Sequence, residues 1–140
     1  MIIYSNVEIV NKNVNDFFNF FFNIKDLIKN FLQTTNYLKE KFNIDIEVID
    51  NKIVISHSNF GKISISIISY NENDFIKYGT DKDSKIEMFF WVQMKYYQPY
   101  KTKFRLAIKV NIPFFLAPFY KKKIKQGLDD LAKHIAKLFG

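Results

Sequence analysis

The sequence predicts an α+β fold in which a curved antiparallel sheet wraps around a long C-terminal amphipathic helix. Two observations lead to this prediction. Between Ile44 and Ile112, apolar and polar residues alternate in short runs, which is typical of strands that bury one face. After Pro113, apolar residues recur at helical spacing instead, so one long helix could cover the apolar face of the sheet.

The composition is that of a folded globular protein. Its 140 residues are 48% hydrophobic and 25% charged, and we expect one domain over residues 1–140. The absence of cysteine excludes a disulfide framework, thiolate zinc ligands and cysteine nucleophiles. The first ten residues do not resemble a signal peptide, and the run IPFFLAPF is too short to cross a bilayer. We therefore expect a cytoplasmic protein.

Helices are expected after a first strand over residues 2–10, which is rich in β-branched residues. Asn13 is a suitable N-cap, and Asp16 places a negative charge in the first turn. Apolar residues then cluster at helical spacing up to Phe31, which predicts either two short helices or one bent helix. A further turn or two of helix is expected over residues 34–42.

Six strands follow as a meander. The turns between them are predicted at Asp50–Asn51, residues 59–61, residues 71–74, the polar loop 81–84, and around Gln98 and Pro99. The fourth of these strands covers residues 75–80, and the last two cover 85–97 and 101–112. With the first strand, the sheet has about seven strands in the order β-α-α-β6-α.

The alternation assigns a face to each side chain of the sheet. The inward set is Ile53, Ile55, His57, Ile63, Ile65, Ile67, Ile76, Tyr78, Ile86, Met88, Phe90, Val92, Phe104, Leu106, Ile108 and Val110. The outward set includes Ser64, Ser66, Glu87, Lys103, Arg105 and Lys109. The helical stripe expected to cover the inward face is Tyr120, Ile124, Leu128, Leu131, Ile135 and Leu138, with Pro118 in the first turn.

This order of elements resembles the helix-grip fold of the START-like superfamily, also called SRPBCC, which includes the birch pollen allergen. The resemblance covers nearly the whole chain. It is strongest to small bacterial members of the superfamily, and the segments that carry it are NKNVNDFFNF, DNKIVISHSNFGKISISI and NIPFFLAPFYKKKIKQGLDDLAKHI. Residues 33–44 depart from the family pattern and would lie beside the cavity mouth. The resemblance implies an apolar cavity between sheet and helix, which members use for lipids, sterols, hormones or polyketides, and sometimes for catalysis.

Residues expected to line such a cavity come from both the inward face and the last helix. They are Ile55, His57, Ile65, Tyr78, Met88, Phe90, Leu106, Ile108, Phe119, Ile124 and Leu128. The leading hypothesis is non-catalytic binding of a hydrophobic or amphipathic, lipid-like small molecule. An alternative is a cyclase-, hydrolase- or isomerase-like enzyme that uses His57 and Tyr78, because histidine titrates near neutral pH. Equally, His57 could be a core histidine, or a bulge near Asn59 could turn it outward.

The positive charge is concentrated at the end of the chain. Residues 1–100 have a net charge of −1, whereas residues 101–140 hold 10 basic and 2 acidic residues. Lys121, Lys122, Lys123 and Lys125 follow a run that contains Phe114, Phe115 and Phe119, so this segment could contact an anionic membrane surface. Alternatively, the aromatic residues close the core and the lysines form a solvated helix face.

Phe89 and Trp91 fall on the outward face of their strand, beside outward basic residues. They could form a homodimer interface, where such residues are favoured. An interaction module that uses this outer face is therefore a third hypothesis. Nucleic acid is not expected, because no recognised RNA-binding motif is present. We also expect no cofactor and no metal site, since metal-ligand spacing is missing and His134 is interpreted as helix-edge packing.

Overall fold

The computed structural model describes residues 1–58, 61–84, 86–111 and 115–140. In chain order its elements are β1 (Ile2–Tyr4), β2 (Glu8–Val10), α1 (Val14–Phe22), α2 (Ile24–Asn30), α3 (Leu32–Phe42), β3 (Asp45–Ile49), β4 (Lys52–His57), β5 (Gly61–Asn71), β6 (Phe75–Thr80), β7 (Met88–Gln98), β8 (Lys101–Val110) and α4 (Ala117–Leu138). The predicted α+β class, with a long C-terminal helix after six meandering strands, is confirmed. Before the meander the chain has one strand and one helix more than the predicted β-α-α-β6-α order.

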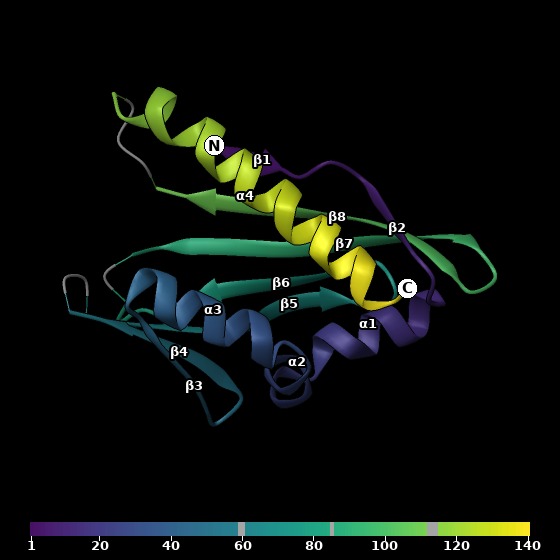
Figure 1. The fold of residues 1–140 in the computed structure, drawn as a ribbon, viewed down its shortest axis with the longest axis horizontal. Coiled ribbons are helices and arrows are strands. Elements are labelled where there is room, and N and C mark those ends of the chain that lie inside the picture. Colours follow the sequence, from purple (N-terminus) through teal and green to yellow (C-terminus); the bar gives the residue numbers. More distant parts are fainter. Residues whose placement is uncertain (59–60, 85, 112–114) are drawn as a thin grey trace.

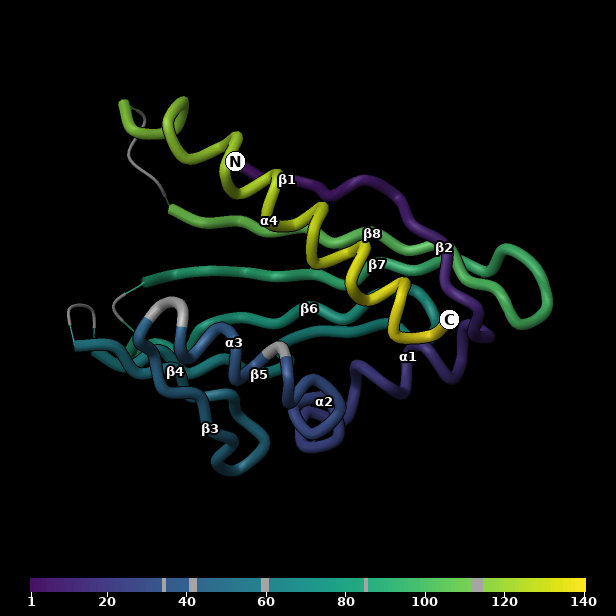
Figure 2. Tube along the Cα trace, in the orientation of Figure 1, coloured from purple at the N-terminus to yellow at the C-terminus, as the bar shows by residue number. Residues whose placement is uncertain are grey.

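All the described strands belong to one antiparallel sheet of eight strands. Its order is β1-β8-β7-β6-β5-β4-β3, and β2 also pairs with β8. The strands from β3 to β8 therefore form the predicted meander. All four helices lie on one side of the sheet, as Figure 1 shows and the tube in Figure 2 makes easier to trace.

The first predicted strand is divided into β1 and β2, and this explains why the sheet has one strand more than expected. Tyr4 pairs with Ala107 and Glu8 with Phe104, so four steps along the first segment match three steps along β8. The extra residue is a bulge, which reverses the alternation of side chains. Both Ile3 and Val10 are therefore buried, although an unbroken strand would point them to opposite faces.

Two short helices, rather than one bent helix, follow β2. The backbone N–H of Asp16 donates to Oδ1 of Asn13 (2.8 Å), which confirms the predicted cap of α1. Asn23 has an extended backbone conformation that ends α1. Its own Oδ1 accepts from the N–H of Asp26 (3.2 Å) and so begins α2. One asparagine thus separates two helices whose axes diverge in Figure 1.

A third helix, α3, is longer than the turn or two predicted for residues 34–42. It ends at Asn43, which has a left-handed backbone conformation (φ 51°). α3 contacts β3 and α2. The segment that departs from the family pattern is therefore a helix that covers the β3 side of the sheet.

The predicted turns at Asp50–Asn51 and at residues 71–74 are confirmed. Asp50 and Asn51 both have positive φ (51° and 61°), as a two-residue turn between twisted strands requires. The N–H of Asp74 donates to the carbonyl of Asn71 (3.0 Å). The predicted reversal at residues 59–61 falls mostly on residues 59–60, which lie outside the described part of the chain.

The ends of the last two strands differ slightly from prediction. β7 begins at Met88 and β8 ends at Val110. Ile86, predicted to face inward, precedes β7 and is exposed, because the chain has not yet entered the ladder. The predicted strand ends at Lys85 and Ile112 lie outside the described residues.

Helix α4 covers only part of the concave face. It contacts β1, β2 and β8, whereas α1 packs on β6, β7 and β8. Leu128, Ala132 and Ile135 are its buried residues. Both ends of the predicted stripe are exposed, Tyr120 at 47% and Leu138 at 45%. The N-terminal end of the helix extends past the end of β8 in Figure 1.

A polar network holds α4 against the loop between β1 and β2. The ammonium of Lys125 donates to Oδ1 of Asn6 (2.9 Å) and to both carboxylate oxygens of Asp129. The backbone N–H of Asn6 also donates to Asp129 (2.7 Å). These bonds from Lys125 and Asn6 hold the pKa of Asp129 below its usual value.

Candidate functional site

An apolar cavity of about 280 Å³ lies between the concave face of the sheet and the helices. Its lining comes from every helix and from β3 to β7. The lining residues are Phe21, Leu27, Ile28, Phe31, Thr35, Leu38, Ile46, Ile53, Ile55, Ile65, Tyr78, Met88, Phe90, Val92, Leu131 and Ile135. Because all but two of these side chains are hydrocarbon or thioether, the cavity is suited to an apolar ligand.

Five of the residues expected at the cavity line it: Ile55, Ile65, Tyr78, Met88 and Phe90. All five are strand residues whose face follows directly from the alternation. Cross-strand pairs bring them together, since Ile55 pairs with Ile46 and Tyr78 with Phe90. The sheet wall of the cavity was therefore readable from the sequence.

The helical wall was largely missed. Leu27, Ile28 and Phe31 belong to the apolar helical cluster of the sequence, but its period does not show which residues face a cavity. Thr35 and Leu38 lie on α3, the segment that fits no family pattern. On α4, Leu131 and Ile135 line the cavity although neither was among the expected cavity residues.

The remaining expected cavity residues lie elsewhere. Leu106 and Leu128 are buried in the core that packs α4 on β8, and Ile108 and Ile124 are half-buried against that core. Phe119 is 71% exposed, and its assignment to the cavity was wrong. The reason is that the first turns of α4 lie beside the edge strand β1, whereas α4 reaches the cavity only at Leu131 and Ile135.

The two polar side chains at the cavity already have partners. The Tyr78 hydroxyl donates to the backbone carbonyl of Phe21 (2.5 Å), and the Thr35 hydroxyl donates to the carbonyl of Phe31 (2.8 Å). Burial raises the pKa of Tyr78 well above its ordinary value, so the phenol stays neutral. Neither hydroxyl has its proton available for a ligand.

His57 and Tyr78 are not brought together. His57 ends β4 and pairs with Gly61 of β5, whereas Tyr78 pairs with Ile67 of the same strand. The two pairs are six residue steps apart along β5, which corresponds to roughly 20 Å. His57 is half-buried and is not among the described lining residues. The residue pair required by the enzymatic alternative therefore does not form one site.

The start of α4 combines exposed aromatic and basic side chains. Phe115 is as exposed as Phe119, at 71%, so neither residue closes the core. Lys121, Lys122 and Lys123 are exposed as well, whereas Lys125 is held by the network with Asn6. The predicted contribution of Phe114 lies outside the described residues.

On the outer face, Phe89 and Trp91 are half-buried beneath a lysine. The ammonium of Lys77 lies 4.6 Å from the Phe89 ring centroid and 5.1 Å from that of Trp91. Arg105 covers Tyr4 in the same way (4.1 Å). The aromatic residues of this face thus have cationic partners within the chain.

None of the helices in the described part of the chain has the length and apolar character that crossing a membrane requires.

Comparison with known proteins gives likeness in structure only. No family model and no curated protein matches the sequence. A point mutant of norcoclaurine synthase from Thalictrum flavum, solved with a transition-state analogue, has a TM-score of 0.63 over 99% of this chain and 93% of its own, at 9% identity. The same plant enzyme with dopamine and hydroxybenzaldehyde gives 0.62 at 10% identity, covering 99% and 85%.

Bacterial structures are similar as well. A protein from Thermobifida fusca has a TM-score of 0.60 at 8% identity, covering 91% of this chain and 84% of its own. One from Deinococcus radiodurans has 0.53 at 14% identity, covering 91% and 100%. These likenesses, with the curved antiparallel sheet and the long C-terminal helix, show that the chain adopts the helix-grip fold.

Proposed function

We propose that this protein binds a small apolar molecule, or the apolar part of an amphiphile, in the cavity between sheet and helices, without catalysis. The observation that carries this proposal is the chemistry of the cavity wall. It is apolar except for two hydroxyl groups, and both already donate to backbone carbonyls. Transfer of hydrocarbon from water into such a wall is favourable and requires no polar group from the protein.

The volume limits the size of the ligand. The cavity encloses about 280 Å³. This is at the lower end of ligand pockets in general. We therefore expect a short chain, a small ring system or the tail of a larger lipid-like molecule as the ligand.

A cavity-filling variant tests the proposal. Ile55→Phe places a larger side chain in the cavity wall, and we expect it to weaken binding of the apolar dye N-phenyl-1-naphthylamine by at least about tenfold, since the ring excludes the dye. The matched control is Ile49→Phe on the neighbouring strand, where the side chain is 47% exposed. Fluorescence titration measures affinity, and thermal unfolding checks that both variants fold.

Two results would contradict the proposal. One is a wild-type protein that takes up no dye and carries no apolar molecule in native mass spectrometry. The other is an Ile55→Phe variant that folds and binds the dye as tightly as the Ile49→Phe control.

The enzymatic alternative requires catalytic groups at the cavity, which the binding hypothesis does not. A cyclase-like activity would need an acid or base that reaches the cavity, and the two hydroxyl groups there are engaged. If such an activity were found, the separation of His57 from Tyr78 predicts that His57→Ala would leave it unchanged. Loss of turnover in a folded His57→Ala variant would instead support this alternative.

Assembly as a homodimer through Phe89 and Trp91 also stays a proposal, as does residence in the cytoplasm. Both aromatic residues retain partial exposure on the outer face. Light scattering of the wild type and of Trp91→Ala at several concentrations tests the dimer, because the variant should dissociate at higher concentration if this face is the interface.

A further inference from the structure

The chain that enters α4 and the first turn of this helix carry an exposed pair of phenylalanines. Phe115 and Phe119 lie four residues apart and are each 71% exposed. Pro118 and Tyr120 between and beside them are exposed too. Figure 1 shows that this part of the helix extends past the end of β8, away from the body of the protein. Large aromatic side chains gathered on a projecting turn are more informative than single exposed apolar residues.

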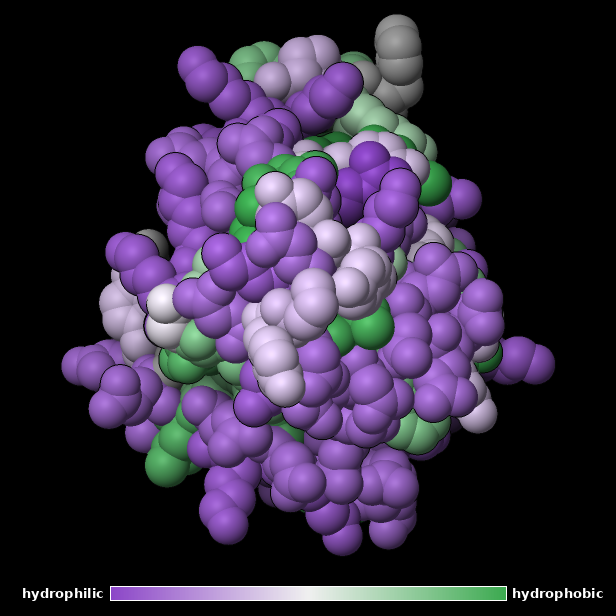
Figure 3. Space-filling view, turned by 90° about the vertical axis from the view of Figure 1, so that its right-hand side faces the viewer, coloured by the Kyte–Doolittle hydropathy of each residue, from purple (hydrophilic) through white to green (hydrophobic). Residues whose placement is uncertain are grey.

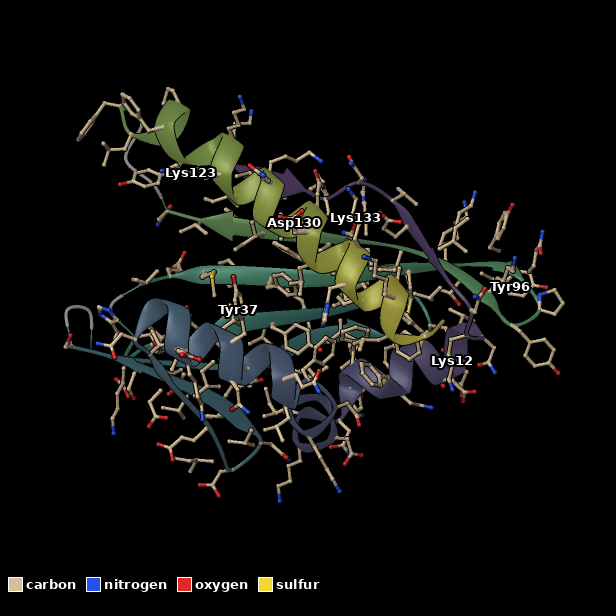
Figure 4. All side chains as sticks on the ribbon, viewed as in Figure 1. Lys12, Tyr37, Tyr96, Lys123, Asp130 and Lys133 are labelled. Carbon is tan, nitrogen blue, oxygen red and sulfur yellow. The ribbon has the colours of Figure 1, made fainter. Side chains whose placement is uncertain are left out.

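Lysines follow the phenylalanines within one turn. Residues 115–128 contain four lysines and no acidic residue. Lys121, Lys122 and Lys123 are exposed, and Figure 4 shows Lys123 in the projecting part of α4, with Asp130 and Lys133 further along the helix. This surface therefore combines apolar rings with an uncompensated positive charge, a pairing that suits the interface of an anionic membrane.

Strand β1, which lies beside the start of α4, adds apolar side chains to this surface. A hollow between α4 and β1 is lined by Ile2, Ile3 and Tyr4 and by Pro118, Lys121, Lys122 and Lys125. β1 is the last strand on its side of the sheet order, and Ile2 is 42% exposed. Its lining combines apolar side chains of β1 with lysines of α4, of which Lys121 and Lys122 are exposed, so the hollow suits a phosphate with adjoining hydrocarbon.

A purely structural role does not explain this composition. Positive charges near a helix N-terminus are unfavourable with respect to the helix dipole. α4 has no acidic residue in its first turn and no side-chain cap at Leu116. The two rings stay 71% exposed, so they bury little area within the chain. The segment therefore does not stabilise the helix, and breaking such local rules is typical of functional surfaces.

We propose that the N-terminal part of α4 docks this protein on an anionic phospholipid surface. Phe115 and Phe119 enter the interfacial layer, and Lys121, Lys122 and Lys123 bind lipid phosphates. The charge of the segment is what favours an anionic lipid surface over an uncharged one. This docking does not depend on the cavity ligand, so either proposal can fail without the other.

Vesicle sedimentation tests the docking directly. The wild-type protein should bind phosphatidylcholine vesicles that contain phosphatidylglycerol, bind pure phosphatidylcholine weakly, and dissociate as NaCl increases. Neutralising three lysines in Lys121→Gln/Lys122→Gln/Lys123→Gln should lower the affinity roughly a hundredfold, at about fivefold per lysine. Phe115→Ser/Phe119→Ser should lower it by at least about tenfold.

Matched controls carry equal changes elsewhere on the surface. Lys12→Gln/Lys82→Gln/Lys101→Gln removes the same charge from exposed positions outside α4, and Tyr96→Ser/Tyr100→Ser removes two exposed rings from the β7–β8 hairpin. Figure 4 places Lys12 and Tyr96 at the end of the molecule opposite Lys123, and Figure 3 shows that end covered mostly by hydrophilic residues. Both controls should bind within about threefold of the wild type, allowing for long-range charge.

A tryptophan reporter shows whether the ring enters the lipid. Trp91 is the only tryptophan, so Trp91→Phe/Phe119→Trp has a single indole at the docking site. Its emission should shift to shorter wavelength on anionic vesicles. An unshifted emission, equal binding of the Phe115→Ser/Phe119→Ser variant, or equal losses in the controls would overturn the proposal. So would light scattering that shows these residues joining two copies of the chain.

Discussion

Tyr78 shows how one side chain can be structural although it lies at the candidate site. Its hydroxyl donates to the carbonyl of Phe21, in the last turn of α1, where carbonyls lack partners within the helix. α1 has no basic residue in that turn to take this role. A side chain of the sheet thus provides the hydrogen-bond donor that a carbonyl at the end of α1 lacks. The phenol ring contributes apolar surface to the cavity wall.

Replacing this tyrosine separates the structural role from a catalytic one. We expect Tyr78→Phe to lower the free energy of unfolding by about 1–3 kcal/mol, because the buried carbonyl of Phe21 loses its donor. Dye affinity should change less than about twofold, since the wall stays apolar. Chemical denaturation and fluorescence titration measure the two quantities. A variant of unchanged stability with greatly reduced ligand binding would show that the hydroxyl serves the ligand.

Asp129 gives stability that depends on pH. Its pKa is lowered in the folded protein by the bonds from Lys125 and Asn6, so the unfolded chain binds a proton more readily at acidic pH. The contribution is complete above the pKa of the unfolded chain, near 4, and is lost as pH falls through the lower folded value. We expect Asp129→Asn to be less stable than the wild type at neutral pH, with a difference that shrinks below about pH 4. Denaturation between neutral and acidic pH checks this, and a constant difference would contradict it.

At the scale of single residues, the alternation along strands predicted which side chains face the cavity. The apolar spacing along helices did not. Ile55, Ile65 and Met88 reach the cavity because every second residue of a strand shares a face. Phe119 follows the helical pattern of the sequence but is 71% exposed on the first turn of α4. How far a helix extends past a sheet depends on tertiary contacts such as those of Lys125, which periodicity does not encode.

Helix α4 contains a glycine that nothing in its surroundings requires. Gly127 is exposed, and an added Cβ would meet no atom within 4 Å. We expect Gly127→Ala to stabilise the protein by about 1 kcal/mol, because alanine loses less backbone entropy in a helix. The Tm should increase by roughly 3 °C for a chain of this size.

Gly79 is the matched comparison, and at this position we expect alanine to lower the stability of the protein. A Cβ at this position would lie 2.8 Å from Cδ1 of Ile68 and 3.1 Å from the ring of Phe89, its cross-strand partner. The Phe89 ring also contacts Lys77, so it is not free to move without cost. Gly79→Ala should lower the Tm in the same experiment. A higher Tm for both variants would show that the crowding around Gly79 on the outer face does not destabilise the alanine variant.

At the scale of elements, the strands and one of their turns could be predicted from the sequence, whereas the bulge between β1 and β2 could not. The two-residue turn at Asp50 and Asn51 has a local signal and was predicted. The bulge between β1 and β2 has none, because it depends on bonds from residues distant in sequence. Ser5 exchanges bonds with the backbone of Leu106, and Asn6 turns toward α4. Such pairings appear only once the chain is folded.

For the molecule as a whole, the arrangement of the helices explains why a cavity remains. α4 covers β1, β2 and β8, and α3 covers β3, so the centre of the sheet between them is covered only in part. The phenylalanines could have filled this space. Instead, Phe17 packs against Phe21, Phe104 and Phe139 at the α1 end of the core. The sequence predicted the fold, but the cavity volume depends on where these rings pack.

The central claim is that a small apolar molecule occupies this cavity. Methyl NMR of isoleucine-labelled protein during titration with N-phenyl-1-naphthylamine tests it most directly, because isoleucines lie both inside and outside. Those of the wall are Ile28, Ile46, Ile53, Ile55, Ile65 and Ile135, and exposed ones are Ile2, Ile9, Ile49 and Ile68. We predict saturable shifts for the wall methyls and none for the exposed ones. Unchanged wall methyls, or shifts confined to the exposed set, would contradict the account.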